Sequence, residues 1–196
     1  MKTVRDACKL QPNALSIKIS DQIEQLDELI DAEGDGFAFF EKTHITNGMQ
    51  DLITEGVNRL AGESSQAVFH LKQAMGGGKT HLLIGLGLLA KHPELRKKYC
   101  ANNPAASKFH DVNVVAFNGR NSPENFFWGE IADQLGKGEQ FKKFWINGPR
   151  APDEKAWLNL FEGDTPTLIL LDELPPYFDY LDTLTSGNGT IADIAT

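Results

Sequence analysis

Residues 76–80 read Gly-Gly-Gly-Lys-Thr, a combination that could hold the phosphates of a nucleotide. Glycines lack a Cβ, so the backbone there can curl and turn its N–H groups toward phosphate oxygens. Lys79 could reach the β- and γ-phosphates, and the hydroxyl of Thr80 is a ligand for Mg²⁺. The sequence therefore predicts an ATP-binding loop formed by Ala74, Met75, Gly76, Gly77, Gly78, Lys79, Thr80 and His81.

One residue departs from the usual phosphate-loop pattern, which is Gly-x-x-x-x-Gly-Lys-Ser/Thr. Gln73 stands where the first glycine would be. It would lie at the exit of the preceding strand, away from the closest approach to phosphate, so a side chain can be tolerated there. The competing interpretation is a glycine-rich turn with an incidental Lys-Thr pair. A strand before the loop, a helix after it and a second motif downstream favour the nucleotide site.

The second motif is LILLDE at residues 168–173, where an apolar run ends in two acidic residues. Such a run is typical of a strand that is buried on both faces in a parallel sheet, and ligands bind at the carboxyl ends of such strands. Asp172 is predicted to hold Mg²⁺ together with Thr80, and Glu173 to orient and polarise the attacking water. A solvated strand end is the alternative. The upstream phosphate loop favours a hydrolytic site with Lys79 and Glu173 as its catalytic residues.

Strand and helix patterns alternate around these motifs. Strands are expected at residues 66–72, 111–119 and 167–173, and helices at 19–31, 48–62, 79–91, from Ser122 onward, and at 139–146 and 153–161. Strands that alternate with helices predict an α/β fold with a parallel sheet.

Length, charge and cysteine content narrow the class of protein. The chain has 196 residues, enough for one domain, and a formal net charge of −8. That charge argues against a generally basic nucleic-acid-binding surface, so DNA contact is expected only indirectly. Cys8 and Cys100 form neither a disulfide framework nor metal-ligand spacing, which favours a reducing cytoplasm. The longest apolar stretch, residues 81–90, is too short to span a bilayer, so no membrane partner is expected.

The two motifs together resemble the Walker A and Walker B motifs of P-loop ATPases with an additional catalytic glutamate, the division that includes AAA-type ATPases. More narrowly, FFEKTHITNGMQDLI, QAMGGGKTH and LLDELPPYFDYL, within residues 39–196, are similar to large prokaryotic ATPases encoded beside DNA methyltransferases in restriction and phage-defence islands. Gln73 is typical of that family. The resemblance implies Mg²⁺-dependent ATP hydrolysis in DNA restriction/modification or phage defence. It also implies protein partners, either further copies of the chain or DNA-modification subunits.

The resemblance further implies a P-loop NTPase three-layer sandwich with sheet order 5-1-4-3-2. A strand carrying a sensor residue would then lie between residues 66–72 and 167–171. We find no strand pattern after Glu173, so the expected domain is incomplete. Residues 1–38 would form an amino-terminal helical extension, and residues 39–196 the amino-terminal portion of an ATPase domain truncated after the Walker B strand. The parent protein is the expected enzyme; the alternative for this chain is a non-catalytic nucleotide-binding or scaffold module that docks partner proteins.

Three further patterns have ordinary structural interpretations. Phe141, Phe144 and Trp145 fall at i, i+3 and i+4 beside two lysines, and we interpret them as the buried face of a helix rather than a base-stacking surface. The basic run at residues 96–98 is expected to be a solvated helix face. Phe39, Phe40 and Thr43 would either contact adenine or belong to the core, and the sequence leaves both possibilities open.

Overall fold

The computed structural model describes residues 35–72, 77–121, 124–147, 150–183, 185–186 and 189–190. In chain order, its elements are α3 (Asp35–Lys42), α4 (Asn47–Leu60), α5 (Lys79–Lys91), α6 (Pro93–Tyr99), the 3-10 turn η3 (Pro104–Ser107), β1 (Asn113–Asn118), α7 (Phe126–Gln134), α8 (Gly138–Phe141), η4 (Lys142–Phe144), α9 (Glu154–Leu160), β2 (Thr167–Asp172), α10 (Leu174–Thr183), β3 (Thr185–Ser186) and β4 (Gly189–Thr190). The helix expected at residues 19–31 lies outside the described residues, as does most of the extension expected over 1–38.

Two parallel strands form the centre of this mixed α/β fold. β1 and β2 pair in register from Asn113 opposite Thr167 to Asn118 opposite Asp172. A parallel pair needs a long crossover, which here contains α7, α8 and α9. The strands expected at 111–119 and 167–173 and their parallel arrangement are therefore confirmed.

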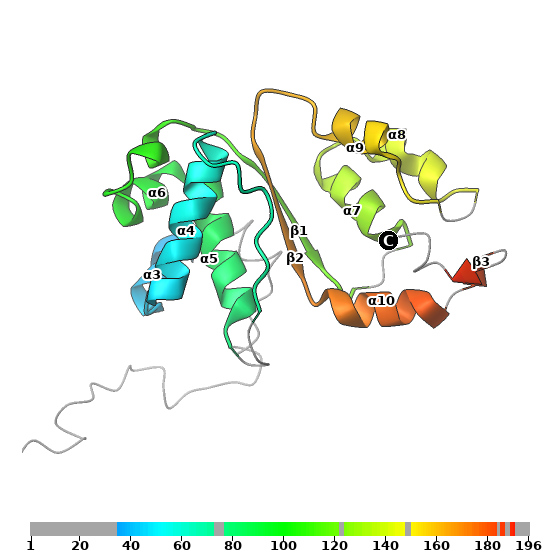
Figure 1. Ribbon diagram of the computed structural model, residues 1–196, viewed down its shortest axis with the longest axis horizontal. Coiled ribbons are helices and arrows are strands. Elements are labelled where there is room, and N and C mark those ends of the chain that lie inside the picture. The colour runs from blue at the N-terminus through cyan, green and yellow to red at the C-terminus, as the bar shows by residue number, and fades with distance from the viewer. Residues whose placement is uncertain are drawn as a thin grey trace, which may run out of the picture.

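Helices cover both faces of the strand pair (Figure 1): α3 to α6 lie on one side, and α7 to α9 on the other. Neighbouring side chains of a strand point to opposite faces. Accordingly, Ala116 and Leu170 belong to the core beneath α4 and α5, while Val115 and Ile169 contact the core formed with α7 and α9. The apolar strand residues thus hold two helical layers to one small sheet.

The helix that follows the glycines is confirmed at residues 79–91. Its residues 84–90 are all buried, which fixes it against β1, β2 and α4. It ends at Lys91, and Pro93 begins α6 in the first helical turn, where its missing N–H costs no hydrogen bond. A buried α5 fixes the position of its first turn, where Lys79 and Thr80 lie.

The strand expected over residues 66–72 is wrong, because the structure forms no strand in this segment. A strand requires a hydrogen-bonded neighbour, and a cavity of about 890 Å³ is lined by residues 67–72 on one side and 168–173 on the other. The expectation that β2 is buried on both faces also needs correction. Leu170 is 2% exposed, but Leu171 is 38% exposed. Among the described strands β2 pairs only with β1, so its other edge borders the cavity.

The edge of β2 that pairs with no other described strand predicts self-association, since an unpaired strand edge is a template for pairing with another chain. In size-exclusion chromatography with light scattering, we expect the chain to form dimers or larger species in addition to the 21.7 kDa monomer. Leu171→Lys should shift the population toward monomer, because a charge on an edge strand opposes pairing. Leu158→Lys is the matched control, since Leu158 is 65% exposed on α9, away from that edge. A purely monomeric wild type would contradict the prediction.

Arg96 corrects the expectation of a solvated basic face at residues 96–98. Lys97 and Lys98 are exposed, but Arg96 is 1% exposed. Its guanidinium donates hydrogen bonds at 2.8–3.1 Å to the carbonyl oxygens of Leu89, Ala90, Ala106, Phe109 and His110. The last carbonyls of a helix have no partner within the helix, and the arginine fork binds those of α5. Burial lowers the pKa of Arg96 through desolvation.

Burial and backbone assignment bear on several further expectations. Phe141 and Phe144 are 4% and 5% exposed, which confirms their interpretation as core residues. α7 begins at Phe126; the start expected at Ser122 lies outside the described residues. The expectation of no strand after Glu173 is wrong, because the short strands β3 and β4 form an antiparallel pair there. Within the described part of the chain, every helix is too short or too polar to cross a membrane.

Candidate functional site

The carboxyl end of β2 meets the first turn of α5. The hydroxyl of Thr80 donates a hydrogen bond of 2.5 Å to Oδ2 of Asp172, although the two residues lie 92 positions apart. Asp172 is 6% exposed, and its Oδ1 accepts the backbone N–H of Glu173 at 3.0 Å. A buried carboxylate needs such partners, because desolvation without them is costly. The fold thus places together the two side chains predicted to bind Mg²⁺.

The backbone turns at Gly78, directly before α5. Gly78 has φ +78° and ψ +23°, which is the left-handed region that favours glycine. Lys79 then begins α5, so the first N–H groups of the helix, which have no partner within it, follow directly. A helix amino terminus attracts anions. Of the predicted loop, Ala74, Met75 and Gly76 lie outside the described residues, as does Gln73 before it, and the phosphate contacts of the loop remain predictions.

His81 is directed toward α3. Its Nε2 lies 2.9 Å from the hydroxyl of Thr43, and that hydroxyl donates to the carbonyl of Phe39 at 2.7 Å. Because the hydroxyl has one hydrogen, the His81 Nε2–H is the donor. The rings of His81 and Phe39 stack with centroids 4.3 Å apart. Phe39 and Phe40 are 5% and 3% exposed, so the structure favours the core interpretation for both.

Glu173 directly follows β2 with an unusual backbone conformation. Its φ is +51°, in the left-handed region, where residues with a Cβ are uncommon. Its carboxylate Oε1 lies 3.5 Å from Nη2 of Arg120, and its side chain is 38% exposed. Glu173, Asp172 and Lys79 all line the 890 Å³ cavity. The three predicted charged site residues therefore share one space at the carboxyl end of β2.

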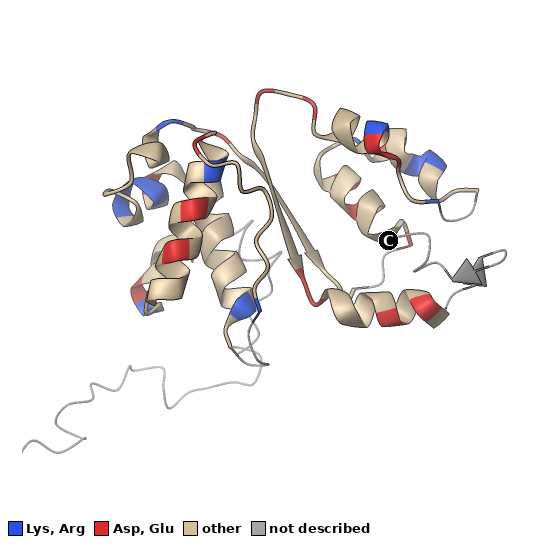
Figure 2. Ribbon diagram, viewed as in Figure 1, with Lys and Arg blue, Asp and Glu red and all other residues tan. Residues whose placement is uncertain are grey.

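The charges at this end of the sheet have both signs. Figure 2 shows acidic residues where β2 passes into α10 and a basic residue in the first turn of α5; these are Asp172, Glu173 and Lys79. No three His, Cys, Asp or Glu side chains of the described residues gather as a metal site. Thr80 and Asp172 would therefore bind Mg²⁺ only together with ligands such as phosphate oxygens and water.

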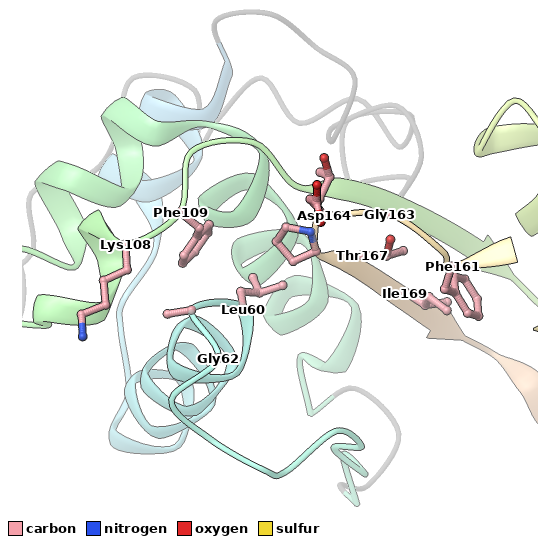
Figure 3. A pocket seen from close by; sticks show the side chains of 12 residues that line it. Leu60, Gly62, Lys108, Phe109, Phe161, Gly163, Asp164, Thr167 and Ile169 are labelled. Atoms are coloured by element: carbon pink, nitrogen blue, oxygen red, sulfur yellow. The ribbon is translucent and has the colours of Figure 1, made fainter. Parts of the chain in front are cut away.

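A second cavity, of about 520 Å³, lies at the opposite end of β2. Figure 3 shows Phe109, Leu60 and Ile169 among its lining residues. Leu60, Phe161, Thr167 and Ile169 line both cavities, so the open space follows β2 along its length. None of the predicted site residues lines the second cavity, so the candidate site is the one at the carboxyl end of β2.

The turn after β1 contains residues that the motifs did not reveal. The strand register places Asn118 opposite Asp172, so Gly119 and Arg120 lie next to Glu173. The available signal was the sequence FNGR at the end of a predicted strand, where a glycine and polar side chains reach the same sheet edge as the acidic pair.

Part of the chain matches a known domain family. Residues 28–112 match the DUF499 N-terminal domain. This domain occurs in large prokaryotic proteins, which is compatible with a large ATPase-associated protein. The match covers less than half of the chain; it includes α3 to α6 with Lys79, Thr80 and His81, and it ends before β1. No curated protein and no solved structure matches the chain.

Proposed function

We propose that the chain binds Mg·ATP where α5 meets β2 and that this site hydrolyses ATP. The contact between Thr80 and Asp172 carries the proposal. A hydroxyl at the start of a helix and an aspartate at the end of a parallel strand are the protein ligands that hold Mg²⁺ in P-loop NTPases. The contact joins two motifs that are distant in sequence, which an incidental glycine-rich turn would not require.

Each side chain has a distinct role in this proposal. Lys79 and the first N–H groups of α5 bind the phosphates, while Gly78 supplies the left-handed turn that aims them. Thr80 and Asp172 hold the metal, which when bound neutralises negative charge on the phosphates. Glu173 orients a water whose oxygen bonds to the γ-phosphorus. The bond to the bridging oxygen breaks, ADP and phosphate leave, and Glu173 accepts the proton from the water.

The arrangement also supports a P-loop NTPase sandwich as the finer fold. A parallel strand pair, helical layers on both faces and a glycine turn leading into a buried helix are all features of that architecture. The cavity between residues 66–72 and β2 lies where the strand order 5-1-4-3-2 places a further strand. Apolar side chains of α5 and of α7 and α9, including Leu83, Leu86, Ile131 and Trp157, line it from both faces, as a central strand would require.

The cellular role proposed for this ATPase rests on the resemblance. We place the chain in a larger AAA-type protein that acts in DNA restriction/modification or phage defence, with ATP and other protein chains as its partners and the cytoplasm as its compartment. The match to a domain of large prokaryotic proteins is compatible with this role.

Magnesium dependence tests the site directly. We expect a fluorescent ATP analogue to bind the wild type at least about tenfold more tightly with Mg²⁺ than with a chelator, a gain of about 1.4 kcal/mol. Asp172→Asn should lose most of that gain, because an amide is a weaker ligand for a hard cation. Asp164→Asn is the control, since Asp164 is exposed near the amino end of β2. Equal gains in the wild type and Asp172→Asn would refute the metal assignment, and binding without turnover would support the scaffold alternative.

A further inference from the structure

Glu173 has a backbone conformation that its own residue type does not favour. A left-handed conformation of a residue with a Cβ is strained, and it persists where the surrounding structure enforces it. The neighbouring structure here is the turn after β1, residues 118–121, because Asn118 is paired with Asp172 in the sheet.

The shape of Gly119 fits the backbone of Glu173. The N–H of Gly119 donates to the carbonyl of Asp172 at 2.8 Å, which extends the hydrogen bonding of the strand pair by one residue. A Cβ on Gly119 would overlap the carbonyl oxygen of Glu173 and lie 2.6 Å from its carbonyl carbon. Only glycine can therefore occupy this position while Glu173 keeps its conformation.

Hydrogen bonds within the turn keep it close to Glu173. The carbonyl oxygen of Asn118 accepts the N–H of Asn121 at 2.9 Å, and the side chain of Asn118 accepts the N–H of Arg120 at 3.0 Å. On the α10 side, a Cβ on Gly119 would also lie 3.0 Å from the Cβ of Tyr177. Tyr177 is 1% exposed, and its hydroxyl accepts the backbone N–H of Phe127 at 3.0 Å. Burial raises the pKa of Tyr177 to about 12, so this anchor stays neutral.

Arg120 adds a charge to this fixed geometry. Its Nη2 lies 3.5 Å from the Glu173 carboxylate, and the two side chains are 69% and 38% exposed. An exposed ion pair of this kind is weak and is screened by salt. It biases the orientation of the Glu173 side chain, whereas Gly119 fixes the backbone from which that side chain extends.

We propose that the turn after β1 positions Glu173 for hydrolysis, with Gly119 acting through shape and Arg120 through charge. The inference rests on the proposed function, because Glu173 is the group that orients water. Both are positioning residues, because each acts through its contact with Glu173. A change in this turn should therefore alter turnover while leaving Mg·ATP binding intact.

Gly119→Ala tests the shape. We expect turnover to fall by at least about tenfold, since a small misplacement of a reacting group is costly, while Mg·ATP affinity stays within about twofold of the wild type. Gly48→Ala is the matched control, because a Cβ at that position in α4 meets no atom within 4 Å. Turnover like the wild type in a folded Gly119→Ala protein would overturn this inference alone, as would an equal loss of affinity. Absence of turnover in the wild type would overturn the proposed function together with it.

If Gly119→Ala shows no cooperative thermal unfolding, that variant is not properly folded, and Arg120→Gln tests the inference in its place. The side chain of Arg120 is exposed, so the substitution leaves the turn backbone in place. We expect turnover about two- to fivefold below the wild type at low salt, and equal turnover at about 1 M salt, where the pair is screened. A merely structural role would not produce this salt dependence. Equal turnover at every salt concentration would overturn the inference.

Discussion

We expect Glu173→Gln to lower the proposed rate of ATP turnover by about 10²-fold or more and to leave Mg·ATP affinity almost unchanged. Positioned acid–base groups contribute on this scale, and a glutamine amide cannot accept a proton from water. Glutamine keeps the Cβ and nearly the same shape, so the strained backbone and its contact with Gly119 remain. The rate is measured by single-turnover hydrolysis with enzyme in excess, and the affinity by titration with a fluorescent ATP analogue.

Glu162→Gln is the control for that measurement, since Glu162 is exposed in the connection between α9 and β2. Its turnover should equal that of the wild type. If Glu173→Gln hydrolyses ATP as fast as the wild type does, Glu173 is not the group that orients water.

We expect Lys79→Ala to lose most of the proposed affinity for Mg·ATP. A hydrogen bond to a charged group contributes about 1.5–3 kcal/mol, which corresponds to a loss of roughly 10- to 150-fold in affinity. Lys79 begins α5 next to the left-handed Gly78, so its ammonium adds to the positive end of the helix. The same titration with a fluorescent ATP analogue gives both dissociation constants.

Lys91→Ala is the matched control, because Lys91 is exposed in the last turn of the same helix. It removes the same charge from the chain and should leave the affinity unchanged. Equal affinities of wild type and Lys79→Ala would refute the assignment of residues 76–80 as the phosphate loop.

The sequence alone was sufficient for elements whose cause is local. Helix α5 follows from an apolar run between glycines and Pro93, and β2 from the short apolar run of residues 168–171. At the start of α4, the side chain of Thr46 accepts the N–H of Met49, an interaction within one helical turn. The pairing of Thr80 with Asp172 was also predictable, because two motifs of known spacing and chemistry specify it.

Tertiary structure decided the features that depend on residues distant in the chain. Residues 66–72 have strand propensity, but a strand forms only where a neighbour supplies hydrogen bonds, and a cavity separates this segment from β2. Arg96 lies in a basic run, yet its side chain is buried and donates hydrogen bonds to carbonyl groups up to 14 residues away. The strained conformation of Glu173 depends on Gly119, a residue 54 positions earlier that only the parallel register brings beside it. Composition and periodicity describe a residue's own preferences; such contacts depend on how distant segments pack.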